Sequence, residues 1–158
     1  MSLLVKIPKL LGPIDLWSDF AMPLTIGTAP VTQTLPSITI AGIPVGAALV
    51  RAVMLVKFRA ISEDSTANNS LSGDQVIQAE KAVGGAWVTG IDVVDGQLFC
   101  SLSSRDTGDV LVGQTDIKAQ VPANGAVIDF QWLDSLALGD TLYIEDLQVG
   151  LRLWFNLP

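Results

Sequence analysis

Apolar and polar side chains alternate with a period of two along several stretches, the pattern of β-strands with one buried face. Over residues 48–60 every even position is apolar. The charged side chains of this stretch stand at odd positions: Arg51, Lys57 and Arg59. Valine and phenylalanine side chains also favour a strand. We therefore predict a long strand over 48–60 with its even positions toward a core.

Two later stretches alternate in the same way. Ile128, Phe130 and Trp132 share one face of a predicted strand over 126–133. Toward the C-terminus, apolar residues again occupy every second position: Leu147, Val149, Leu151, Leu153 and Phe155. This phase places Trp132 in the core and Trp154 on the face opposite to its apolar neighbours.

Short turn signals separate the remaining strands. Asp95-Gly96 and Asn124-Gly125 are typical of two-residue hairpin turns, because glycine and asparagine tolerate positive φ. The strands that flank these turns are predicted over 88–94, 97–103, 117–121 and 126–133, and another short strand is predicted over 109–112. Residues 75–83 fit either a helix capped by Asp74 or a strand, and we favour the strand because it continues the meander.

About eight strands at this spacing predict an all-β fold, an antiparallel β-sandwich of jelly-roll type over residues 36–158. An immunoglobulin-like sandwich is the second interpretation. Six of the eight prolines precede residue 45, and proline disfavours helices and central strands. We therefore predict an extended, proline-rich apolar arm over 1–35, laid on the chain's own body or on a neighbouring subunit. Its predicted subunit contacts are Leu10, Leu11, Ile14, Trp17 and Phe20.

Composition narrows the function classes. The chain has 158 residues, 49% hydrophobic and 16% charged, which excludes a disordered protein. It contains no histidine, so a Ser-His-Asp triad, a Cys-His dyad and histidine metal sites are excluded. Cys100 is the only cysteine, so no disulfide forms within the chain. No phosphate-binding glycine motif occurs, and we expect no enzyme, no cofactor and no metal.

The net charge of −7 is unevenly distributed. Residues 1–60 carry five basic and two acidic side chains, whereas residues 61–158 carry four basic and fourteen acidic ones. Such asymmetry favours contact between copies of the chain, whereas the net negative charge disfavours sequence-specific nucleic-acid binding. The candidate contact residues are Arg51, Lys57, Arg59 and Trp154. Prolines and lysines interrupt the apolar N-terminus, so we expect no signal peptide, no membrane span and a soluble protein.

Residues 36–61 and the C-terminus resemble small jelly-roll virion structural proteins. The segments that carry this resemblance are Gly-Ile-Pro-Val-Gly at 42–46, Val-Arg-Ala at 50–52, Lys-Phe-Arg at 57–59 and Gly-Leu-Arg-Leu-Trp-Phe at 150–155. The resemblance implies a minor capsid, decoration or penton-type subunit in a virion. It also implies that the chain assembles with itself and with other structural proteins.

Three function classes follow. The leading hypothesis is a non-enzymatic structural subunit of a symmetric assembly that makes contacts through its N-terminal arm and its sandwich surface. The alternative is a carbohydrate- or receptor-binding module that uses exposed tryptophans. The third is an enzyme that uses carboxylates alone, for which Asp92, Asp129 and Glu145 are the candidate side chains.

Overall fold

The computed structural model describes residues 9–21, 24–26, 31–62, 69–70, 75–80, 86–92, 99–100, 105–106, 111–121, 125–134 and 142–157. Regular structure in this part of the chain is nearly all β, and the strand pairs are antiparallel. The longer strands are β1 (Lys9–Trp17), β3 (Val31–Thr39), β4 (Ala48–Ser62), β6 (Gln75–Glu80), β7 (Val88–Asp92), β11 (Val127–Asp134) and β12 (Leu142–Leu157). The short elements are β2 (Leu24–Ile26), β5 (Asn69–Ser70), β8 (Phe99–Cys100), β9 (Arg105–Asp106), β10 (Leu111–Val112) and the 3-10 helix η1 (Lys118–Gln120).

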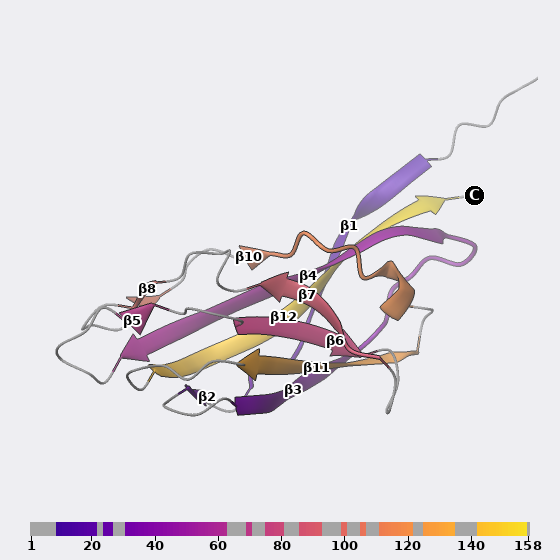
Figure 1. Cartoon of the computed structure of the whole chain (residues 1–158). Coiled ribbons are helices and arrows are strands. Elements are labelled where there is room, and N and C mark those ends of the chain that lie inside the picture. Colours follow the sequence, from indigo (N-terminus) through magenta and orange to yellow (C-terminus); the bar gives the residue numbers. More distant parts are fainter. Residues whose placement is uncertain are drawn as a thin grey trace, which may run out of the picture.

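The strands form two main sheets. The first has the order β1-β12-β4-β10, with β2 also paired to β12 and β9 to β4. The second has the order β3-β11-β6-β7, and β5 pairs with β8 separately. Figure 1 shows the start of β1 beside the end of β12, in agreement with the pairing of Lys9 with Leu157.

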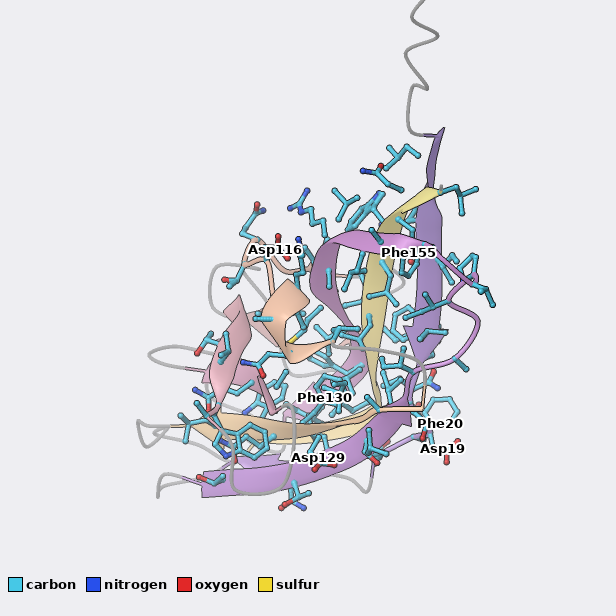
Figure 2. The ribbon with its side chains drawn as sticks, turned by 90° about the vertical axis from the view of Figure 1, so that its right-hand side faces the viewer. Asp19, Phe20, Asp116, Asp129, Phe130 and Phe155 are labelled. Atoms are coloured by element: carbon cyan, nitrogen blue, oxygen red, sulfur yellow. The ribbon has the colours of Figure 1, made fainter. Side chains whose placement is uncertain are left out.

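One core lies between the two main sheets, as in a β-sandwich. It takes side chains from both sheets, and the ring of Phe58 on β4 meets that of Trp132 on β11 edge to face, with centroids 5.8 Å apart. Figure 2 shows Phe130 and Phe155 among these interior side chains. The predicted alternation is confirmed by its buried members: Ala52, Met54, Val56, Phe58, Leu147, Val149, Leu151, Leu153 and Phe155. It is wrong at the start of β4, because Ala48 and Val50 stand at even positions and yet are exposed.

Three local predictions have clear outcomes. The strand favoured over 75–83 is confirmed over Gln75–Glu80, which form β6, and residues 81–83 lie outside the described residues. Trp132 is fully buried as predicted. The strand predicted over 117–121 is wrong, because this segment forms η1. Ile117 and Val121 are buried while Ala119 is exposed, which strand alternation would not give. The turn at Asp95-Gly96 lies outside the described residues.

The described start of the chain lies on the chain's own body, which is one of the two placements expected for the proline-rich arm. Residues 9–21 lie along the chain's own β12 through the pairing of β1 and through two backbone hydrogen bonds, Ser18 N to Val149 O (2.9 Å) and Ala21 N to Leu147 O (2.8 Å). Residues 24–26 pair with β12 as β2. An edge strand tolerates Pro13 because its outer side needs no backbone donor. The expected boundary between residues 35 and 36 falls inside β3, since Pro36 is likewise accommodated on an edge strand.

Candidate contact surface

The outer face of the first main sheet brings charged and aromatic side chains together from three strands. Lys57, Arg152 and Trp154 alternate with buried neighbours, and Asp15 lies between Ile14 and Leu16, which pack against the core, so these side chains point away from it. We call this surface the cation–tryptophan face, and its members are Asp15, Trp17, Arg51, Lys57, Arg152 and Trp154. Three of them, Arg51, Lys57 and Trp154, are candidates from the sequence, and Trp17 is a predicted arm contact.

Strand register sets which members of this face are neighbours. Trp154 on β12 lies directly opposite Arg51 on β4. Arg152 lies opposite Asp15 on β1, two residues further along β12. Side chains opposite one another on one face of an antiparallel pair are within contact distance. The face is therefore a set of cross-strand pairs rather than a scatter of surface residues.

Asp15 and Arg152 form a two-pronged ion pair. Arg152 Nε donates to Asp15 Oδ1 at 2.8 Å, and Nη2 donates to Oδ2 at 2.7 Å. Both side chains are about 30% exposed. The hydrogen bonds that Arg152 donates to Asp15 raise the pKa of Arg152 above its ordinary value, and the charge of Asp15 also contributes. This pair fixes the side chains at the centre of the face.

Each tryptophan of the face has a cation over its ring. The guanidinium of Arg51 lies 5.2 Å from the centroid of Trp154, and the ammonium of Lys57 lies 4.7 Å from that of Trp17. Both distances are within the range of cation–π attraction. Cations and aromatic rings therefore alternate across the face, which the spacing along the sequence does not predict.

Gly150 lets one of these rings lie close to the sheet. A Cβ atom on Gly150 would come within 2.9 Å of Trp17 Cε3 and within 3.1 Å of Leu55 Cβ. The absence of a side chain thus gives the Trp17 ring room above β12 and beside Leu55. Leu55 stands at an odd position of β4 yet is fully buried, so part of this outward face is shielded from water.

The predicted arm contacts differ in their exposure to solvent. Leu10 on β1 and Phe20 beyond its end are 61% and 63% exposed, whereas Ile14 is half-buried and packs against the core. The side chains of Leu11 and Arg59 lie outside the described residues, although their backbones belong to β1 and β4. Contact with another subunit stays a prediction for all of these residues.

The carboxylates proposed for an enzyme lie apart. Asp129 follows the buried Ile128 on β11, and Glu145 follows the buried Ile144 on β12, so the two lie on the outer faces of different sheets. The register of the second sheet separates Asp92 from Asp129. Asp92 on β7 is in register with Val76 on β6, and Val76 is in register with Leu133 on β11. Leu133 lies four residues along β11 from Asp129. That offset is about 13 Å along the strand. The described residues contain no group of three or more His, Cys, Asp or Glu placed to hold a metal ion.

Asp15 and Arg152 are not among the candidates from the sequence. Each lies between apolar residues of its strand, Ile14 and Leu16 or Leu151 and Leu153, which marks both as outward-facing. Their opposite charges are compatible with an ion pair. Only the register of β1 on β12 shows that Asp15 and Arg152 lie opposite one another.

The comparisons with known proteins identify no relative. No protein-family model, no curated protein and no solved structure matches this chain. Among the described residues, none of the helices has the length and apolar character needed to cross a membrane.

Proposed function

We propose that the chain is a non-enzymatic structural subunit of a symmetric assembly, with a jelly-roll fold of eight principal strands. Its location would be a virion, where it would serve as a capsid or decoration component. Its partners would be further copies of itself and other structural proteins of the same particle.

The strand order supports the jelly-roll part of this proposal. Taken in chain order, the eight principal strands are β1, β3, β4, β6, β7, β10, β11 and β12. The first pairs with the last, the second with the seventh, the third with the sixth and the fourth with the fifth. This nested pairing is what results when one long antiparallel hairpin is wrapped into two sheets. Jelly rolls occur in viral capsid and lectin domains, so the fold favours assembly or binding over any particular chemistry.

The observation that carries the assembly proposal is a set of exposed apolar side chains at one end of the sandwich. We call this set the apolar end, and its members are Leu10 (61% exposed), Val45 (100%), Val50 (38%) and Val127 (45%). All lie where β1, β4 and β11 begin and where β3 and β12 finish, the end at which Figure 1 marks the C-terminus.

No polar side chain interrupts the loop at this end, since residues 40–50 are all apolar or glycine. Exposed apolar side chains are typical of interaction sites where they form a contiguous patch. Full burial of a leucine or valine side chain stabilises a contact by about 1.5–3 kcal/mol. A second copy or another structural protein is the occupant that this surface favours.

The carbohydrate-binding alternative is disfavoured by the cation–tryptophan face. A sugar ring stacks on a free aromatic face. The rings of Trp17 and Trp154 each have a cation over them, which a sugar would have to displace. A titration of the protein with a panel of glycans, followed by tryptophan fluorescence, should therefore be flat.

Two matched substitutions test the assembly proposal. Val127 and Val112 are both 45% exposed on strands, but only Val127 belongs to the apolar end. Val127→Asp should lower the particle mass measured by light scattering, while Val112→Asp should leave it at the wild-type value. Equal masses for both variants and the wild type would overturn the role of the apolar end.

A further inference from the structure

The start of the chain is attached to the rest of the molecule through a single strand. Among the described residues β1 pairs only with β12, and β2 also pairs only with β12. Backbone hydrogen bonds from Ser18 and Ala21 to β12 continue this pairing. We call residues 9–21 and 24–26 the first segment. It can separate from β12 without breaking any other strand pair in the described part of the chain.

The first segment contributes little to the core between the two main sheets. Only two of its described side chains, Ser18 and Ala21, are buried, and both are small. Ile14 and Leu16 pack against the core but are half-buried. The ion pair to Arg152 is partly exposed, and a pair of this kind adds little stability. Regions with few buried apolar contacts open at a lower free energy than the whole fold does.

Opening of the first segment uncovers a surface that is complementary to that segment. The edge of β12 loses its backbone partners, and Leu55 loses the neighbouring ring of Trp17. Gly150 leaves the space in which that ring lies, and Arg152 supplies the two donors that bind Asp15. An unpaired strand edge is a template for a strand of another chain. The first segment of a second copy carries the same side chains and therefore fits this surface.

We propose that copies of the chain exchange their first segments, so that β1 of one copy pairs with β12 of another. This inference rests on the proposed function, because it states how copies of a self-assembling subunit are joined. Each contact that the first segment makes within one chain is then made between two chains. Exchange of an identical element is for this reason a low-cost route to a dimer.

Cysteines placed across β1 and β12 test the exchange. Leu16 on β1 is in register with Leu151 on β12, and residues opposite one another in an antiparallel pair lie at a separation that a disulfide can bridge. One variant carries Leu16→Cys and the other carries Leu151→Cys, so a disulfide between these positions joins two chains. Both variants also carry Cys100→Ser, which removes the only native cysteine.

A second pair of positions on the same strand provides the matched control. Met54 on β4 is in register with Leu151 on the other side of β12. The proposal leaves this pairing within one chain, so a mixture of Leu151→Cys with Met54→Cys, again with Cys100→Ser, should give no link between chains. Circular dichroism and the thermal unfolding midpoint establish that each variant is folded.

The two variants of each mixture are unfolded in urea, refolded together and oxidised, and the products are separated by non-reducing electrophoresis. The proposal predicts disulfide-linked dimers from the Leu16→Cys and Leu151→Cys mixture and none from the control mixture. Linked dimers that are absent from the first mixture, or equally abundant in both, would overturn it. A chain with both Leu16→Cys and Leu151→Cys gives a second readout. Linked dimers of that chain support the exchange, and a disulfide within a monomeric chain contradicts it.

The outcomes also separate the exchange from the role of the apolar end. If Val127→Asp lowers the particle mass and the first mixture gives no linked dimers, the proposed function stands and the exchange is wrong. If linked dimers form while Val127→Asp keeps the wild-type mass, the exchange stands and the role of the apolar end is wrong. A wild-type chain that has the mass of a single copy at every concentration, with no linked dimers from the first mixture, overturns both.

Discussion

Asp15 and Arg152 are 137 residues apart in sequence, yet they form a bidentate ion pair across β1 and β12. The pair joins the first strand of the sheet to the last. It anchors the outer face on which Trp17 and Trp154 lie, and it ties the start of the chain to the body through side chains as well as through the backbone.

Asp15→Asn should destabilise the fold by about 0.5–1 kcal/mol, because an ion pair that is partly exposed to water contributes little more than this. Urea unfolding measures the difference, which should shrink at high salt. Asp19→Asn, at an exposed position after β1, is the matched control and should have no effect. A loss above about 3 kcal/mol would mean that the pair is effectively buried.

The effect of Asp15→Asn should be constant between about pH 6 and about pH 9. The pKa of Arg152 is raised in the folded chain, so its contribution is fully present below the unfolded pKa. That contribution is lost only as the pH rises through the still higher folded pKa. A difference that falls steadily between neutral and mildly alkaline pH would contradict this assignment.

Asp116 accepts a hydrogen bond from the backbone at the edge of β4, beyond the end of β10. Its Oδ1 accepts hydrogen bonds from Ala52 N at 3.1 Å and from Lys118 N at 3.0 Å. Asp116→Ala should cost about 1–3 kcal/mol because it leaves the Ala52 amide of a buried strand without this acceptor. Asp116→Asn, which keeps a carbonyl oxygen, should cost less. Hydrogen exchange at Ala52 should be faster in the alanine variant only, and equal exchange rates would contradict the role.

Gly113 and Gly90 test how closely the two sheets approach. A Cβ atom on Gly113 would collide with the backbone carbonyl oxygen of Gly90, whereas a Cβ on Gly90 would meet the flexible end of Met54. Gly113→Ala should therefore cost about 1–3 kcal/mol, as overpacking does, and Gly90→Ala less. Thermal unfolding of the two variants measures which one loses more stability. A larger loss for Gly90→Ala would contradict the packing of β7 against the segment after β10 that contains Gly113.

Gly150→Ala should displace the ring of Trp17, since the new methyl group would lie 2.9 Å from its Cε3 atom. We expect a loss of about 1–3 kcal/mol, together with a changed tryptophan emission spectrum. In a Trp17→Phe background the spectral change should disappear. A spectral change that persists there would place the effect on another tryptophan.

Alternation predicts the strands whose two faces differ in polarity. Leu147, Val149 and Leu151 are buried as their spacing indicates, because each strand face of a sandwich has one environment. Leu55 breaks the rule since Trp17, from a distant part of the sequence, lies beside it. The sequence therefore predicts the two-residue period of β4, but it does not predict that part of the outer face of β4 is buried.

The candidate site depends on register, which the sequence does not contain. Arg51, Lys57 and Trp154 were identifiable as outward-facing, yet nothing in their spacing pairs Arg51 with Trp154. The first strand was harder still, because its prolines suggested a segment outside the sheet. An edge strand accepts a proline that a central strand would not, and this explains why Lys9–Trp17 joins the sheet.

The mass of the full chain in solution, measured by sedimentation over a range of concentrations, tests the central claim most directly. A self-assembling subunit should give particles several times heavier than the 16.7 kDa chain, with a mass that rises with protein concentration. A species of 16.7 kDa at every concentration would contradict self-assembly.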